Sequence, residues 1–151
     1  MKTPLHTLLV AALLGIGLGA SAQTKLNVGT NSFTQSTGDE FSVFNSITKY
    51  LAKGDAASLS SWFAETLDVT VISSTRNCSR RQAQEILRTF FAANTPRSFQ
   101  VMHKASEANK KYLIGLLSAG GELFQVTIYA TSTGGETYKI QELNISRQTG
   151  Y

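Results

Sequence analysis

The sequence predicts an α+β domain in which three N-terminal helices pack on a bent antiparallel sheet of about five strands. Apolar residues recur at helical spacing in three segments of the first half. From Ser98 onward they alternate with a period of two or fall in short runs typical of strands. Two Gly-Gly pairs, at 120–121 and 134–135, predict hairpin turns between the last strands.

The first two predicted helices follow each other closely. Ordered structure is expected from Phe41, where apolar residues at helical spacing begin. Gly54 ends this helix as a C-terminal glycine, and Asp55 can cap the next one. The second helix is short and carries Leu59, Trp62 and Phe63.

A strand, a loop and a third helix come next. Residues 67–72 are rich in β-branched side chains and are predicted as a strand, and the polar residues 73–78 as a loop. Ser79 and Gln82 have the spacing of a capping box and open the third helix. The helix stops before Pro96. Its apolar face consists of Ala83, Ile86, Leu87, Phe90 and Phe91.

The remaining chain is predicted as four strands. In the first, Phe99, Val101, His103 and Ala105 share one face by the two-residue period. The second, residues 112–118, is apolar on both faces, which predicts a central strand covered on both sides. The third spans residues 123–131. In the fourth, residues 138–146, the apolar residues change parity near Gln141, and this predicts a β-bulge.

The N-terminus has the pattern of an export signal. Lys2 precedes an apolar run, and Ala20-Ser21-Ala22 fits the small-x-small cleavage site. The run is too short to span a bilayer, which takes roughly 20 residues. We therefore expect a signal peptide over residues 1–22, a polar flexible lead-in over 23–40 and one domain over 41–147. The predicted location is periplasmic or extracellular, with no transmembrane segment after signal removal.

The order of elements resembles the nuclear transport factor 2-like, or cystatin-like, α+β cone. Within that superfamily the chain is similar to small exported bacterial proteins of undetermined function. The residues that carry the resemblance are mostly core and capping positions: Ile47, Leu51, Gly54, Asp55, Ala56, Leu59, Trp62 and Phe63; Gln82, Ala83, Ile86, Leu87, Phe90 and Phe91; Pro96, Ser98 and Phe99; Tyr112, Ile114 and Gly115; and Tyr138, Ile140, Leu143 and Ile145. The resemblance implies a fold and no particular chemistry, since function depends on sites that differ within a fold.

Three residues are candidates for acid-base chemistry. His103 is expected on an apolar strand face, where an imidazole could titrate near neutrality and act as a general base. Asp68 lies in an otherwise apolar strand, and Tyr129 could donate a hydrogen bond to a ligand. Each has a structural alternative: a hydrogen-bonded His, a solvent-facing Asp beside Thr70, and a packing Tyr.

The basic residues Arg76, Arg80, Arg81 and Arg88 form the one charge cluster. Arg80 and Arg81 fall in the first turn of the third helix, where positive charge is unfavourable. We therefore name Arg76, Arg80 and Arg81 as a candidate anion site. The alternative is a solvated helix face on which Glu85 pairs with Arg81 and Arg88.

Several function classes are disfavoured. The single cysteine, Cys78, cannot form an internal disulfide; a helix dipole could lower its pKa, but a plain, partly buried thiol is the preferred interpretation. One Cys with the single His103 of the mature chain makes a poor zinc site. The net charge of +4 from 14 basic and 10 acidic residues is mild, and no basic stripe with aromatic platforms predicts nucleic-acid binding. No cofactor is expected.

The expected function is a non-catalytic domain of the cell envelope that binds a small apolar or amphipathic ligand or a protein partner. The alternative is a cofactor-free acid-base enzyme of the isomerase or dehydratase type that uses His103. Because residues 112–117 are apolar on both faces and helices cover one, a homodimer through the sheet face is also expected.

The export signal yields the first testable prediction. Protein exported by its own host should begin at or near Gln23, because the cleavage pattern ends at Ala22. Intact mass spectrometry of periplasmic or secreted material measures this directly. Membrane-bound protein that still carries residues 1–22 would contradict it.

Overall fold

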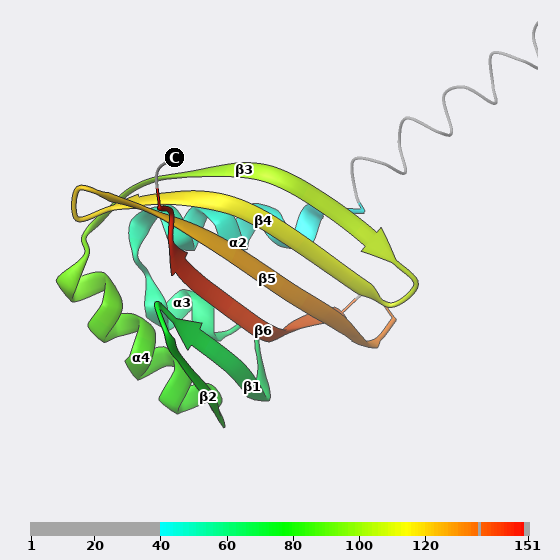
Figure 1. Cartoon of the computed structure of the whole chain (residues 1–151). Helices are drawn as coiled ribbons and strands as arrows, with labels where there is room; N and C mark the ends of the chain where they lie inside the picture. Colours follow the sequence, from blue (N-terminus) through cyan, green and yellow to red (C-terminus); the bar gives the residue numbers. More distant parts are fainter. Residues whose placement is uncertain (1–39, 136, 150–151) are drawn as a thin grey trace, which may run out of the picture. The chain divides into compact units, whose positions relative to one another are not determined.

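The computed structural model describes residues 40–135 and 137–149. The predicted signal peptide and residues 23–39 of the predicted lead-in lie outside them. The helices are α2 (Ser42–Lys53), α3 (Ala56–Ser60) and α4 (Arg80–Ala93) (Figure 1). The strands are β1 (Phe63–Val71), β2 (Ser74–Ser79), β3 (Pro96–Glu107), β4 (Lys110–Ala119), β5 (Glu122–Gly134) and β6 (Thr137–Arg147).

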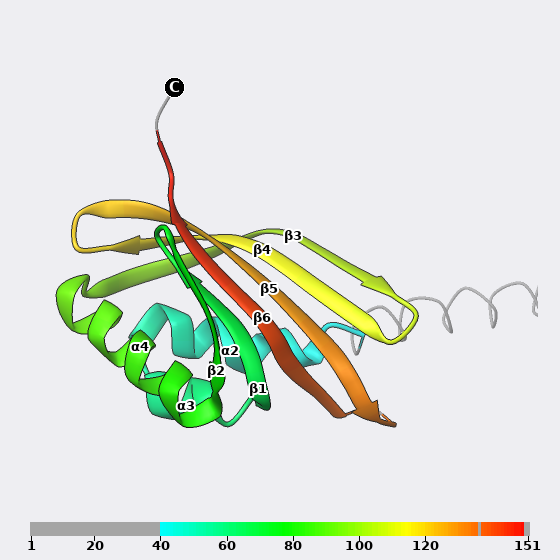
Figure 2. The ribbon, with the colours of Figure 1, turned by 60° about the horizontal axis from the view of Figure 1, so that its bottom comes forward.

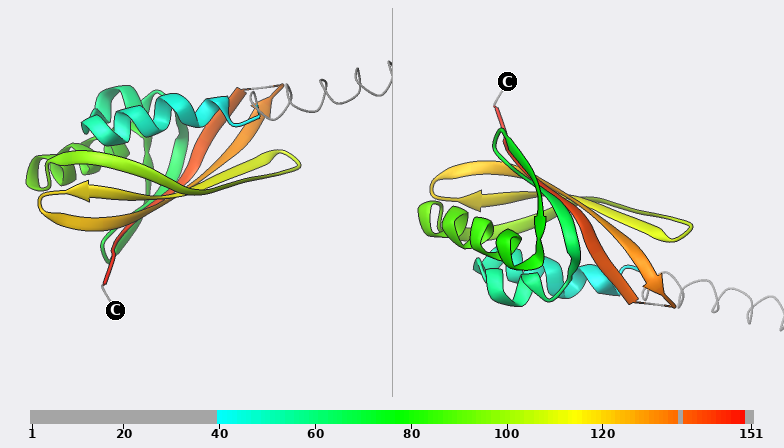
Figure 3. Two further views of the ribbon diagram at one scale, coloured as in Figure 1. Left: turned by 90° about the horizontal axis from the view of Figure 1, so that it is seen from above. Right: turned by 90° about the horizontal axis from the view of Figure 1, so that it is seen from below.

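The strands form one sheet in the order β2-β1-β6-β5-β4-β3. The prediction of an α+β domain is correct, but two details of the sheet are wrong. The sheet has six strands, and the pair β1–β6 is parallel while the other pairs are antiparallel. The three described helices lie on one face of the strongly twisted sheet (Figures 2 and 3).

The sixth strand, β2, replaces the polar loop predicted over residues 73–78. β2 pairs with β1 alone, with Val69 opposite Arg76 and Leu67 opposite Cys78. Most of its side chains are exposed, and only Cys78 is buried. An edge strand of this kind needs no apolar alternation, because it is stabilised by its backbone pairing with β1. The sequence therefore carries no strand pattern there.

The second helix is shorter than predicted. α3 ends at Ser60, so Trp62 lies beyond it and Phe63 begins β1. The backbone explains the change, because the amide of Ile140 in β6 donates to the Trp62 carbonyl at 2.7 Å. The chain is already aligned beside β6 at that point and cannot continue as a helix.

The helix ends agree with the sequence. Gly54 adopts the left-handed conformation (φ 69°) after α2, where residues with a Cβ are strained. The Asp55 carboxylate accepts from the Ser58 amide at the start of α3. Ser79 and Gln82 form the full capping box of α4, with both reciprocal bonds present.

The core lies between the helices and the inner sheet face. Its fully buried members include Phe44, Ile47, Leu51, Leu59, Phe63, Leu67, Leu87, Leu113, Leu117, Phe124, Ile128 and Ile140. α2 packs against β3, and α4 packs against β1 and β2. None of the described helices is long and apolar enough to cross a membrane.

Among the register shifts of the sheet, one in β6 and one in β3 bear on the sequence predictions. The predicted bulge in β6 is confirmed, since Tyr129 pairs with Glu142 and Ala130 with Ile140, leaving Gln141 unpaired. A second bulge, not predicted, occurs at Met102 of β3. There Val101 pairs with Gly115 and His103 with Ile114.

The cap at Asp55 yields a stability prediction. Hydrogen bonds from the Ser58 amide and hydroxyl favour the ionised carboxylate and lower the pKa of Asp55. Its contribution is therefore present above about pH 4, the unfolded value, and is lost as pH falls through the lower folded value. Asp55→Ala should cost about 1 kcal/mol of unfolding free energy at neutral pH.

Asp55→Asn is the matched control, because asparagine caps without titrating in this range. Chemical denaturation between pH 3 and 7 should show a wild-type advantage over Asp55→Ala that shrinks below about pH 4. An advantage that is unchanged at acid pH would contradict the assigned role of the carboxylate.

Candidate functional site

His103 lies on the outer face of the sheet, away from the helices. The expectation that it shares a face with Phe99 and Val101 is wrong, because the bulge at Met102 inserts one residue and reverses the alternation. The imidazole is exposed, and its Nε2 lies 3.0 Å from the Tyr112 hydroxyl. An exposed, hydrogen-bonded ring of this kind is not a base in an apolar pocket.

Asp68 and Tyr129 also lie on the outer face. Both line an open groove of about 460 Å³, together with polar residues of β1, β4, β5 and β6. The Asp68 carboxylate accepts from Asn77 Nδ2 at 2.7 Å, and the ring of Tyr129 lies 5.7 Å from that of Tyr112. The three acid-base candidates thus share a face, but His103 reaches this groove only through Tyr112.

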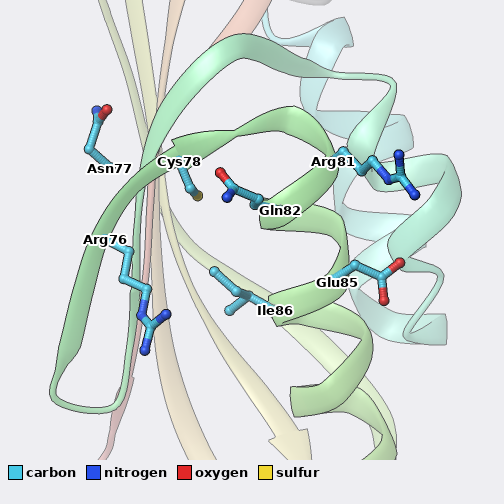
Figure 4. Close-up of a pocket in the computed structure, with 7 residues that line it drawn as sticks. All are labelled: Arg76, Asn77, Cys78, Arg81, Gln82, Glu85 and Ile86. Carbon is cyan, nitrogen blue, oxygen red and sulfur yellow. The ribbon is translucent and has the colours of Figure 1, made fainter.

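The three candidate arginines do not converge. The Arg80 Nε donates to the Phe63 carbonyl at 3.1 Å and so ties the start of α4 to the start of β1. The guanidinium of Arg81 extends to the side of α4 away from β2 (Figure 4). Glu85 pairs with Arg88 at 3.1 Å, and both side chains are more than half exposed. Arg76 and Arg81 nevertheless line one hollow, so the predicted set of three arginines comes together in part, without Arg80.

The concave surface that Arg76 and Arg81 both line lies between β2 and α4. Arg76 comes from the inner face of β2 and shares this hollow of about 660 Å³ with Asn77, Cys78, Gln82, Glu85 and Ile86 as well as Arg81 (Figure 4). The Arg76 guanidinium makes no hydrogen bond or ion pair with any residue in 40–135 or 137–149. A ligand in the hollow would meet the cationic side chains of Arg76 and Arg81, while the Glu85 carboxylate is paired with Arg88.

The hollow continues toward the C-terminal end of α4. A second concavity of about 460 Å³ shares Arg76 and Ile86 with the first and adds a mostly apolar lining of Val69, Val71, Ile72, Thr89, Phe90 and Ala93. The two form one groove along α4, which we call the β2–α4 groove. Sequence analysis missed it because half of its wall is the strand predicted as a loop.

Ile72 stands at the apolar end of the β2–α4 groove in a strained conformation. Its φ of 61° is left-handed, which is rare for a β-branched residue. Its amide donates to the Ile145 carbonyl at 2.6 Å, which holds the β1–β2 turn in place. The side chain is 38% exposed, so core packing does not account for isoleucine at this position.

Cys78 forms part of the groove floor, and its burial disfavours a nucleophilic role. It is a free cysteine, 7% exposed. Burial, and to a smaller extent the negative charge of Asp68, raises the pKa of its thiol, while Arg76 opposes the shift. A neutral thiol reacts slowly, and it provides an apolar floor. No group of His, Cys, Asp and Glu within the described ranges could hold a metal ion.

The fold is shared with solved structures of low sequence identity. A protein of the DUF4783 family from Bacteroides uniformis is 18% identical, with a TM-score of 0.66 over 70% of this chain and 97% of that one. A domain of unknown function with a cystatin-like fold from Nostoc punctiforme is 14% identical, with a TM-score of 0.60 over 76% of this chain and 80% of that one.

A proposed dehydratase from the NTF2-like family of Streptomyces avermitilis is 12% identical, with a TM-score of 0.53 over 70% of this chain and 92% of that one. No curated protein is significantly similar to the chain. These neighbours confirm the nuclear transport factor 2-like, or cystatin-like, fold. The family described as "Domain of unknown function (DUF4783)" matches residues 44–146, most of the chain, and the protein belongs to this family.

Proposed function

We propose that the protein is a non-catalytic binding domain of the cell envelope, and that the β2–α4 groove holds an amphipathic ligand with an acidic group. The observation that carries the proposal is the continuity of the groove. The guanidinium of Arg76, which has no hydrogen bond or ion pair within the described part of the chain, lies beside an apolar trough that ends at Ile72 and Phe90. Concave, mostly apolar sites with a few polar groups are the usual form of ligand sites.

The strain at Ile72 supports the same proposal. A left-handed conformation costs a β-branched residue on the order of 1–2 kcal/mol, and asparagine would adopt it at lower cost. An exposed isoleucine retained there is consistent with a role in contacting a ligand rather than in folding.

The acid-base alternative has less support. Its candidate residues His103, Asp68 and Tyr129 lie on the outer sheet face, and all three are exposed. A general base gains its catalytic power where water is excluded and the substrate is held. An open polar surface offers neither.

Binding of a dansyl-labelled undecanoate, an amphipathic carboxylate, tests the proposed function. Arg76→Gln should weaken it roughly tenfold, because a charge-assisted hydrogen bond contributes about 1.5–3 kcal/mol. Arg97→Gln, at the exposed start of β3 on the opposite sheet edge, makes the same charge change and should have no effect. Equal losses in both variants, or no binding by the wild type, would refute the proposal.

Ile72→Asn separates binding from folding. Relief of the strained conformation should leave the melting temperature unchanged or raise it, while loss of the apolar side chain should weaken binding of the same probe several-fold. Thermal denaturation and probe fluorescence measure the two effects on one sample. A large loss of stability without loss of binding would show that Ile72 serves the fold alone.

A homodimer through the outer sheet face is compatible with this site, and we retain it as a proposal. Tyr112, Ile114 and Leu116 of β4 project from that face, and Tyr129 is 41% exposed beside them. The β2 edge lies at the end of the sheet and would stay accessible. Sedimentation at high micromolar concentration should show a dimer that Leu116→Glu dissociates; a monomeric wild type would contradict it.

A further inference from the structure

The outer edge of β2 carries unpaired backbone groups. β2 is the terminal strand of the sheet, with β1 on its one paired side. The Ser79 amide turns away from β1 and donates to the Gln82 side chain at 2.9 Å. By the alternation of an antiparallel ladder, the amides and carbonyls of Thr75 and Asn77 also point outward. These two residues therefore present the donors and acceptors that a further strand would use.

β2 has little of the protection that edge strands usually carry. Natural edge strands are usually blunted by proline, bulges or inward-pointing charges. The opposite edge strand, β3, has such devices: it begins at Pro96, bulges at Met102 and carries Lys104 on its inner face. β2 has no proline or bulge, and its inward-pointing charge, Arg76, faces the β2–α4 groove. Its side chains on the outer sheet face, Thr75 and Asn77, form hydrogen bonds with Thr70 (2.9 Å) and Asp68 (2.7 Å) of β1. They therefore lean toward β1 and do not shield the backbone at the outer edge.

The open edge and the β2–α4 groove lie along the same strand. Side chains of an added strand would alternate between the outer sheet face and the side on which α4 stands. Those on the α4 side would pass Cys78 and Gln82 first, then Arg76 and Ile86, and finally the apolar end at Ile72 and Phe90. One strand could thus fill the groove with side chains while its backbone pairs with β2.

We propose that the ligand of the β2–α4 groove is an extended peptide segment of a partner protein that adds to β2 as an antiparallel strand. It carries an acidic residue opposite Arg76 and a large apolar residue two positions later, which enters the end formed by Ile72 and Phe90. The acidic residue of the peptide is inferred from the Arg76 guanidinium, which can form a charge-assisted hydrogen bond with it. The antiparallel direction is inferred because antiparallel strands pair more strongly than parallel ones. This inference rests on the proposed function and names its ligand class.

The test uses the fluorescein-labelled peptide acetyl-Thr-Ser-Thr-Glu-Thr-Leu-Thr-amide and the purified protein in fluorescence anisotropy. Its Ser, Glu and Leu face the groove in the proposed register, and the two threonines that flank Glu pair with Thr75 and Asn77. N-methylation of those two threonines should weaken binding at least tenfold, because it removes backbone donors and leaves the groove-facing side chains unchanged. Equal affinity of both peptides overturns the proposal.

Two protein variants form a matched pair. Asn77→Pro removes the outward amide, which the pairing with β1 does not use, and Asn77→Ala removes the side chain but keeps the amide. Peptide binding should fall about tenfold in Asn77→Pro relative to Asn77→Ala, whereas dansyl-undecanoate binding should be equal in the two. The undecanoate comparison also shows that the proline variant is folded.

The outcomes separate this inference from the proposed function. Undecanoate binding without peptide binding overturns the peptide inference and leaves the groove as the site. Loss of both probes in the wild type overturns the proposed function itself. A dimer of the peptide-free protein that Asn77→Pro abolishes would show that a second copy occupies the edge, and that result also overturns the peptide inference.

Discussion

The direct junction of β2 and α4 at Ser79 is the constraint on which the rest of the site depends. Ser79 is the last residue of β2 and the N-cap of α4, so strand and helix diverge from one residue with no linker between them. The capping box fixes the first turn of α4, and the Arg80 bond to the Phe63 carbonyl ties that turn to β1. A groove must then open between β2 and α4, with Cys78 at its closed end and Arg76 and Ile86 further along.

This arrangement suits binding better than catalysis. The groove is lined by the cations Arg76 and Arg81, an apolar trough and a buried thiol, and its walls are a helix and a paired strand. Rigid walls lower the entropy lost on binding, which favours affinity. The acid-base candidates lie on the other face of the sheet, where the rings of His103, the half-buried Tyr112 and Tyr129 follow one another across neighbouring strands. The proposed ligand groove and the acid-base candidates therefore lie on opposite faces of the sheet.

The features that sequence analysis predicted correctly depend on local interactions. The Gly54 and Asp55 caps, the Ser79–Gln82 capping box and the Gly-Gly hairpin turns each involve residues within a few positions of one another. The β6 bulge was visible because its apolar residues change parity on either side of Gln141. In such cases the residues that fix the geometry are close together in the sequence, so the geometry can be predicted from it.

What sequence analysis missed depends on pairing between distant segments. β2 is a strand because β1 lies beside it, and its side chains alone indicate a loop. The bulge at Met102 leaves no mark in the sequence, yet it moves His103 to the outer face. Arg80 was grouped with Arg76 and Arg81 by proximity in the chain, although its partner is the carbonyl of Phe63, 17 positions away. The β2–α4 groove combines these effects and could not be predicted.

Amide hydrogen exchange of β2, measured with and without the acidic-apolar peptide, tests the central claim most directly. The amides of Arg76 and Cys78 already pair with β1 and should exchange slowly in both states. The amides of Thr75 and Asn77 face outward and should exchange quickly in the free protein and at least tenfold more slowly in the complex. Protection confined to residues around Asp68 and Tyr129 on the outer face, with no change at Thr75 and Asn77, would contradict the account.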